Sequence, residues 1–233
     1  MSDAREIGRA VIIGVAAKEH GDNATFIIDP AKFIASHACQ LHAEIEEATG
    51  ASSGSATSAA FTRSTCGTQG IQFLPVANQR LTVKLLEAPS PFVGMPMIKC
   101  FAGAGGKEVI FLPWQEDRCT LTVLSNSADL FLTGPLSGCN VYLATRAGSP
   151  PMVFHGNANA NSSSVPLNNQ VKDAEAARIA GEKGYSITNR LARGQYELPA
   201  FICGYRFDTT WAMFVHEFNV ATRVQSNKSL PAK

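Results

Sequence analysis

Apolar residues along most of this chain occur in short runs, often alternating with polar residues, and Gly, Pro, Asn or Ser separates many of the runs. Runs of four to eight residues with this punctuation are typical of β-strands. A sheet-rich core is therefore expected. The predicted strands upstream of residue 134 cover residues 10–17, 71–76, 81–86, 96–101, 109–114, 121–124 and 129–133.

Two further apolar runs, 140–144 and 151–155, flank a loop at 145–149 that contains Gly and Ser. This pattern predicts an antiparallel hairpin. Cys139 and His155 are equally distant in sequence from Ala147, so a hairpin without a bulge would place them opposite one another. Opposed residues have Cβ atoms roughly 5 Å apart, which would allow thiol and imidazole to meet. A thiol attacks as the thiolate, and a neighbouring imidazole can take its proton.

Two segments carry helical rather than strand patterns. The first is 30–48, with Asp29 as its cap, and its apolar residues Ile34, Ala38, Leu41 and Ile45 fall on one face. The second is 171–183, which ends at Gly184. The small and polar stretches 51–64 and 156–169 are expected to be mobile loops. We therefore expect an α/β fold, a β-sandwich core with flanking helices, in one domain over 1–225 with a flexible tail at 226–233.

Composition narrows the functional classes. The 233 residues are 45% hydrophobic and 17% charged, with a formal net charge of +1, which gives no electrostatic reason to expect nucleic acid or an anionic membrane as partner. No apolar stretch is long enough to span a bilayer, and the first residues do not resemble a cleavable signal peptide. The six cysteines lack paired short spacings, so reduced thiols are expected.

The order of short motifs between residues 109 and 156 resembles a known enzyme family. The motifs are Phe-Leu-Pro-Trp at 111–114, Asp-Leu-Phe-Leu-Thr at 129–133, Leu-Ser-Gly-Cys at 136–139 and Val-Phe-His at 153–155. They resemble the glutamine deamidase toxins, the family of the Burkholderia lethal factor and the cytotoxic necrotizing factors, with the former the closer. The hairpin here looks longer than in the lethal factor, and Gly134-Pro135 replaces bulkier aromatic residues. Both departures affect the expected substrate more than the expected reaction.

The resemblance implies a fold like the catalytic domain of the cytotoxic necrotizing factors and a Cys-His-Thr site. Cys139 would be the nucleophile, His155 the base and then the acid, and Thr133 the residue that orients the imidazole. The backbone N–H of Cys139, made accessible by Gly138, would be an oxyanion donor, and Ser137 would shape the loop. No metal and no cofactor is expected.

The same resemblance implies a partner and a location. The partner would be a protein that carries a target glutamine, such as a translation-initiation helicase or a Rho-type GTPase. A monomeric toxin or effector is expected, made in a bacterial cytoplasm and then secreted or delivered into the host-cell cytosol.

Other interpretations of these residues stay open. The same Cys and His could serve a transglutaminase, a thiol acyltransferase or a cysteine peptidase, and the fold could be a binding module without turnover. Each residue could also be structural: Cys139 as a small buried hydrophobe, Thr133 as a strand former. His216 is expected to be a core histidine and is the reserve base. The cluster His37, Cys39 and His42 is spaced poorly for metal on a helix.

Overall fold

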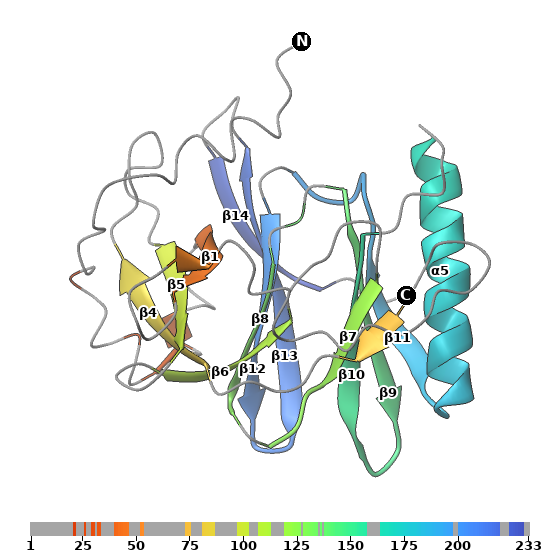
Figure 1. The fold of residues 1–233 in the computed structure, drawn as a ribbon, viewed down its shortest axis with the longest axis horizontal. Coiled ribbons are helices and arrows are strands. Elements are labelled where there is room, and N and C mark those ends of the chain that lie inside the picture. The colour runs from red at the N-terminus through yellow and green to blue at the C-terminus, as the bar shows by residue number, and fades with distance from the viewer. Residues whose placement is uncertain are drawn as a thin grey trace.

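The computed structural model describes part of the chain, shown in Figure 1. The described residues are 21, 26, 29–30, 32–33, 40–46, 52–53, 73–75, 81–86, 97–102, 107–112, 119–126, 128–134, 136, 138–157, 164–197, 200–219 and 224–230. These residues are mostly β-sheet, arranged as two sheets with one long helix among them.

The larger sheet has nine strands in the order β14-β13-β12-β8-β6-β4-β5-β1-β2. Most neighbouring pairs are antiparallel, but β6 and β8 are parallel, as are β1 and β5. The strands are β1 (Gln40–Glu46), β2 (Ser52–Ser53), β4 (Leu81–Leu86), β5 (Met97–Ala102), β6 (Lys107–Leu112), β8 (Leu130–Thr133), β12 (Ala200–Phe207), β13 (Thr210–Asn219) and β14 (Val224–Ser229).

The smaller sheet has five strands in the order β11-β9-β10-β7-β3, with β3 and β7 parallel. The helix α5 (Val165–Glu182) packs against the outer face of this sheet, as Figure 1 shows. The strands are β3 (Phe73–Pro75), β7 (Cys119–Val123), β9 (Asn140–Arg146), β10 (Ser149–Gly156) and β11 (Ser186–Leu191).

Side-chain alternation divides each central strand between two environments. On β10, Val153 belongs to the core between the two sheets, whereas Met152 and Phe154 belong to the layer under α5. The core between the sheets takes residues from both of them, including Phe131 of β8 and Val141 of β9. The segment between β8 and β9 crosses from the larger sheet to the smaller one, so the ends of these strands meet at the edge of this core.

Most of the predicted strands are present. The structure has strands within or overlapping the predicted segments 71–76, 81–86, 96–101, 109–114, 121–124, 129–133, 140–144 and 151–155. The predicted strand at 10–17 lies outside the described residues, as does most of the predicted loop 51–64. Ser52–Ser53, at the start of that loop, form β2.

Two helix predictions need correction. The segment predicted as a helix over 30–48 is strand β1 from Gln40 to Glu46, paired with β5. Helical residues occur at its start, where the Lys32 N–H donates to Oδ1 of Asp29 at 3.0 Å, as a capping residue allows. The second helix begins at Val165 rather than at residue 171, because Ser164 caps it and Pro166 fits its first turn.

The tail prediction was also wrong in part. β14 (Val224–Ser229) pairs with β13 over six residues, so the chain up to Ser229 belongs to the larger sheet. Residues 231–233 lie outside the described residues. The described helices include none with the length and apolar character that crossing a membrane requires.

Candidate active site

Thr133 and His155 come from different sheets and meet in the core between them. Oγ1 of Thr133, at the end of β8, lies 2.6 Å from Nδ1 of His155 on β10. Both side chains are fully buried. Thr133 shares its strand face with Phe131, and His155 shares its face with Val153, so alternation directs both side chains into the inter-sheet core.

The hydrogen bonds of Thr133 determine the tautomer of His155. The Thr133 hydroxyl also lies 2.8 Å from the carbonyl oxygen of Leu112, which can only accept a hydrogen bond. A hydroxyl has one hydrogen, so it donates to Leu112 and accepts from Nδ1 of His155. Nδ1 therefore carries the ring proton, and Nε2 has an unprotonated lone pair.

Nε2 of His155 is the atom available for proton transfer. It is buried and has no hydrogen-bond partner among the residues that the structure describes. Burial and, to a smaller extent, the nearby positive charge of Lys172 lower the pKa of His155 from its ordinary value of 6.5 to about 3. A neutral imidazole with a free lone pair is the form that a general base requires.

Cys139 lies on the same face of the smaller sheet as His155, but not opposite it. Val141 is the register partner of His155, and Cys139 precedes Val141 by two residues. Cys139 is therefore the diagonal neighbour of His155, a relation with a Cα separation of about 7–8 Å. No hydrogen bond joins its Sγ to Nε2 of His155. Cys139 is 1% exposed and packs within the inter-sheet core.

The predicted register was wrong by two residues, and the hairpin explains why. Ser149 pairs with Arg146, which puts the turn at Ala147 and Gly148 rather than centring it on Ala147. A bulge between Ser149 and Met152 then inserts one more residue on β10. Each of the two features shifts the register partner of His155 by one position along β9. The partner is therefore Val141 instead of Cys139.

Several side chains outside the predicted triad hold the loop that carries Cys139. The Tyr196 hydroxyl accepts a hydrogen bond from the Gly138 N–H at 3.1 Å and donates to the Cys139 carbonyl at 2.9 Å. Nζ of Lys172 donates to the Gly138 carbonyl at 3.0 Å. Gly138 has φ +140°, a conformation that side chains disfavour, so glycine suits this loop. Ser137 lies outside the described residues.

Asn140, the residue after the cysteine, is held by a second set of contacts. Its Nδ2 donates to the Tyr142 hydroxyl at 2.9 Å, and its Oδ1 accepts from the Arg193 N–H at 3.1 Å. The Tyr142 hydroxyl donates to Asp173 of α5 at 2.9 Å. Burial raises the pKa of Tyr142 well above its ordinary value, so this hydroxyl stays protonated as a donor. The network fixes the start of β9 to the helix.

We did not predict a role for Lys172, Tyr196 or Asn140 from the sequence. Lys172 lies in one stripe with Ala176 and Ala180 at spacings of four, and all three are buried. A lysine in line with two alanines on a buried helix face was a usable signal. Nothing comparable marked Tyr196, because it lies in the irregular segment between β11 and β12.

The reserve base His216 faces away from this site. It neighbours Val215 on β13, and Val215 points into the inter-sheet core. Alternation therefore directs His216 to the other face of the larger sheet, where its ring stacks on Phe201 with centroids 5.0 Å apart. His37 and Cys39 lie outside the described residues, which contain no group of metal-ligating side chains.

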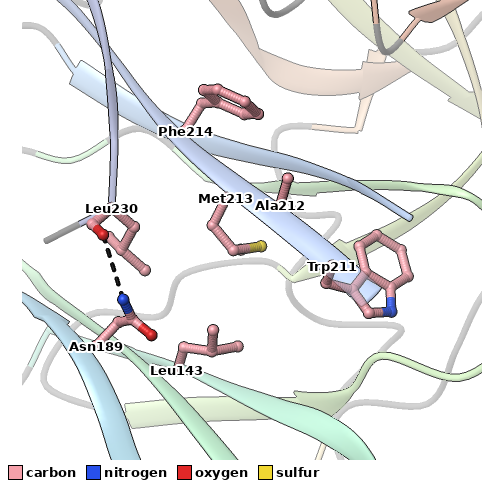
Figure 2. A pocket seen from close by; sticks show the side chains of 7 residues that line it. All are labelled: Leu143, Asn189, Trp211, Ala212, Met213, Phe214 and Leu230. Carbon is pink, nitrogen blue, oxygen red and sulfur yellow. Dashed lines mark hydrogen bonds between the residues drawn. The ribbon is translucent and has the colours of Figure 1, made fainter. Parts of the chain in front are cut away.

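A separate hollow of about 220 Å³ opens elsewhere between the sheets, and Figure 2 shows its lining. Trp211 and Met213 of β13 lie across from Leu143 and Asn189 of the smaller sheet, and Asn189 donates to the Leu230 carbonyl at 3.2 Å. This hollow shares no lining residue with the Cys139 site. Its lining is largely apolar and lacks a nucleophile.

Two comparisons with known proteins give no match, so the function of this chain is inferred from its own residues. A scan of the chain against protein-family models finds no match, and a search of curated proteins finds none either.

Because His155 and His216 are buried in their neutral forms, we expect the folded protein to lose stability in acid. The folded pKa of His155 is about 3 and its unfolded pKa is about 6.5, so between these values the unfolded chain binds more protons. Stability is therefore full above about pH 6.5 and falls as the pH drops toward 3. At about 1.4 kcal/mol per pKa unit, we expect a loss on the order of 3 kcal/mol by pH 4. Urea unfolding at several pH values would measure it.

His216, with its pKa lowered by burial to about 4, contributes in the same direction. The comparison of His155→Gln with His216→Gln therefore separates the two histidines. Each variant should show a shallower decline in unfolding free energy with acid than the parent protein. An unchanged decline in His155→Gln would show that the imidazole is not held neutral.

Proposed function

We propose that this protein is a cysteine-dependent protein-glutamine deamidase that converts a target glutamine to glutamate and ammonia through a thioester. The observation that carries the proposal is the tautomer of His155. The Thr133 hydroxyl accepts from Nδ1 and leaves Nε2 unprotonated, on the face of the smaller sheet that also carries Cys139.

The first half of the reaction uses Cys139 and His155 in turn. Sγ attacks the carboxamide carbon while Nε2 accepts the thiol proton, and the carbonyl π electrons move to the oxygen to give a tetrahedral oxyanion. When the oxyanion reforms the carbonyl, the C–N bond breaks, and Nε2–H gives its proton to the departing nitrogen. The products are a thioester and ammonia.

Water completes the cycle in the second half. Nε2 takes a proton from a water molecule as the water oxygen attacks the thioester carbon, and collapse of this second tetrahedral intermediate expels the Cys139 sulfur. The proton on Nε2 returns to the thiolate, and the glutamate product leaves as a carboxylic acid that ionises in solvent. Both Cys139 and His155 are at most 1% exposed, so covering residues must be displaced before glutamine and water can enter.

A target glutamine within a protein is the proposed substrate. The support for this substrate is the resemblance of residues 109–156 to glutamine deamidase toxins, together with the Thr-His contact that such a site requires. By the same resemblance, we propose a translation-initiation helicase or a Rho-type GTPase as the target, a catalytic-domain fold like that of the cytotoxic necrotizing factors, and a role as a toxin or effector.

Hydrolysis in water enriched in heavy oxygen tests the reaction type. Deamidation through a thioester places one solvent oxygen in the new carboxylate, which mass spectrometry of the target peptide would detect. A transglutaminase would instead leave an amide bonded to an added amine, with no solvent oxygen. Binding of the target without any modified glutamine or released ammonia would contradict the proposal and favour a non-catalytic module.

Two substitutions of Thr133 are expected to lower the rate of deamidation by different amounts. Thr133→Val keeps the shape of the side chain but removes the acceptor for Nδ1, so the imidazole loses its fixed tautomer and orientation. We expect the rate of deamidation to fall by about 10- to 100-fold, less than the ~10⁴-fold cost of losing a carboxylate that orients a catalytic histidine. Thr133→Ser, which keeps the hydroxyl, should retain most of the rate. Equal rates for Val and Ser variants would reduce Thr133 to a packing role.

A further inference from the structure

Lys172 is a buried cation without a carboxylate partner among the described residues. Its side chain is 2% exposed, and no salt bridge to it occurs in the described part of the chain. Asp173, the next residue, is engaged elsewhere: Nε and Nη2 of Arg190 each bind one of its carboxylate oxygens at 2.8 Å. Because burying a charge is costly unless it is paired, Lys172 is expected to have another source of negative charge.

The hydrogen bond of Lys172 directs it at the nucleophile loop. Nζ donates to the carbonyl of Gly138, the residue immediately before Cys139, at 3.0 Å. This places the ammonium group beside the peptide bond that leads into Cys139. It reaches this point from α5, on the outer face of the smaller sheet, whereas His155 faces the inner core.

We propose that Lys172 is the cation that stabilises the Cys139 thiolate, so that the ammonium is the buried counter-charge of the sulfur once the thiol proton has passed to Nε2 of His155. This inference rests on the proposed function for its catalytic meaning. A positive charge held in a low-dielectric surrounding favours a nearby thiolate over the thiol. Lys172 acts here as a positioning and electrostatic residue, and Cys139 remains the group that forms the covalent bond.

Other groups around Cys139 do not supply that charge. His155 is neutral, because burial and the neighbouring Lys172 both lower its pKa. Tyr196 is a neutral hydroxyl, because burial raises its pKa above the ordinary value. Burial lowers the pKa of Lys172, and the charged forms of Cys139, Cys119 and Asp173 act in the opposite direction. Among the remaining charged groups on the neighbouring elements, Asp173 and Arg190 form an ion pair. The guanidinium of Arg193 lies over the ring of Tyr196, 5.9 Å from its centroid.

The thiolate can be measured without any substrate. A thiolate absorbs near 240 nm and a thiol does not, so the difference spectrum between the protein and its Cys139→Ala variant, followed against pH, gives the pKa of Cys139 alone. We expect a value below the ~8.5 of an unperturbed cysteine. A value at or above ~8.5 would overturn the proposal. If Cys139→Ala does not fold, the pH dependence of alkylation at Cys139, followed by peptide mass spectrometry of the unaltered protein, gives the same pKa without a variant.

Variants of Lys172 then assign the cause. Lys172→Met keeps the length of the side chain and removes the charge, and should raise the pKa of Cys139 by at least about one unit. Lys172→Arg should restore most of the shift, and Arg178→Met, at an exposed position of the same helix, should leave the pKa unchanged. Equal pKa values in the folded Met variant and the parent would contradict the role of Lys172. If the pKa of Cys139 is lowered but the protein deamidates no glutamine, the proposed reaction is overturned and the role of Lys172 is not.

Discussion

Replacing Cys139 by serine is expected to lower the rate of glutamine deamidation by at least about 10³-fold. The hydroxyl differs from the thiol by one atom, but it is a far weaker acid and a weaker nucleophile at neutral pH. Cys139 packs in the inter-sheet core, where a hydroxyl costs on the order of 1 kcal/mol unless it finds a hydrogen-bond partner. The fold should therefore survive while turnover is lost. Initial rates of ammonia release, with thermal unfolding of the same samples, would measure both.

Cys203 provides a matched control for this substitution. It is a second fully buried cysteine outside any disulfide, on β12. It pairs with Leu132, but strand alternation directs its side chain to the face of the larger sheet opposite to that of Ile202, which belongs to the inter-sheet core. Cys203→Ser should change stability by a similar amount and leave the rate of deamidation within about threefold of the parent. If Cys139→Ser kept a tenth or more of the parent rate, Cys139 would not be the nucleophile.

Replacing His155 by glutamine is expected to reduce deamidation by about 10²- to 10⁴-fold, because the same imidazole serves as base in the attack and as acid for the departing ammonia. Glutamine can still donate a hydrogen bond to Thr133 but cannot exchange protons at neutral pH. The effect should appear in kcat rather than in KM, since His155 is assigned to proton transfer and not to binding. Steady-state rates against glutamine-containing target would measure it.

His216→Gln is the control for His155. Both histidines are buried and both have lowered pKa values, but His216 faces the other side of the larger sheet. His216→Gln should therefore keep the parent rate when folded. A folded His216→Gln protein as inactive as His155→Gln would contradict the assignment of the base and return His216 to consideration.

The relative positions of Cys139 and His155 show how much of the structure local sequence patterns can predict. The apolar runs and the Gly-Ser loop were enough to predict the hairpin of β9 and β10, because strand propensity and turn chemistry are local. The register was predicted wrongly, since it depends on the turn at Ala147 and Gly148 and on a bulge between Ser149 and Met152. Pro150 and Pro151 lie at this bulge and were a sequence signal for it. Cys139 and His155 consequently lie on one face as diagonal neighbours rather than opposite each other.

The contact of Thr133 with His155 was predicted on different grounds. Their hydrogen bond was expected from the resemblance alone, and the structure shows it at 2.6 Å, while the catalytic role of Thr133 stays a prediction. Lys172 could not be assigned in the same way. Its spacing with Ala176 and Ala180 could have indicated burial. Its proposed role depends on α5 crossing the outer face of the smaller sheet, and helix packing is a tertiary choice that a sequence pattern does not fix.

Strand β12 shows why part of the sheet was missed. Gly204 interrupts an apolar run and resembles a turn signal, yet it lies in the middle of the strand. A Cβ at this position would clash with the sulfur of Met213, so glycine here permits close packing against β13. The first predicted helix failed for a related reason: helical periodicity at 40–46 was overridden by pairing with β5.

The most direct test of the central claim is a search for modified glutamines in a host-cell lysate incubated with the protein and, in parallel, with Cys139→Ser. We expect mass spectrometry to find a specific glutamine converted to glutamate by the parent protein, with release of ammonia, and the same glutamine unchanged in the serine sample. No converted glutamine in either sample, or equal conversion in both, would contradict the assignment of this fold and its Cys139 site to glutamine deamidation.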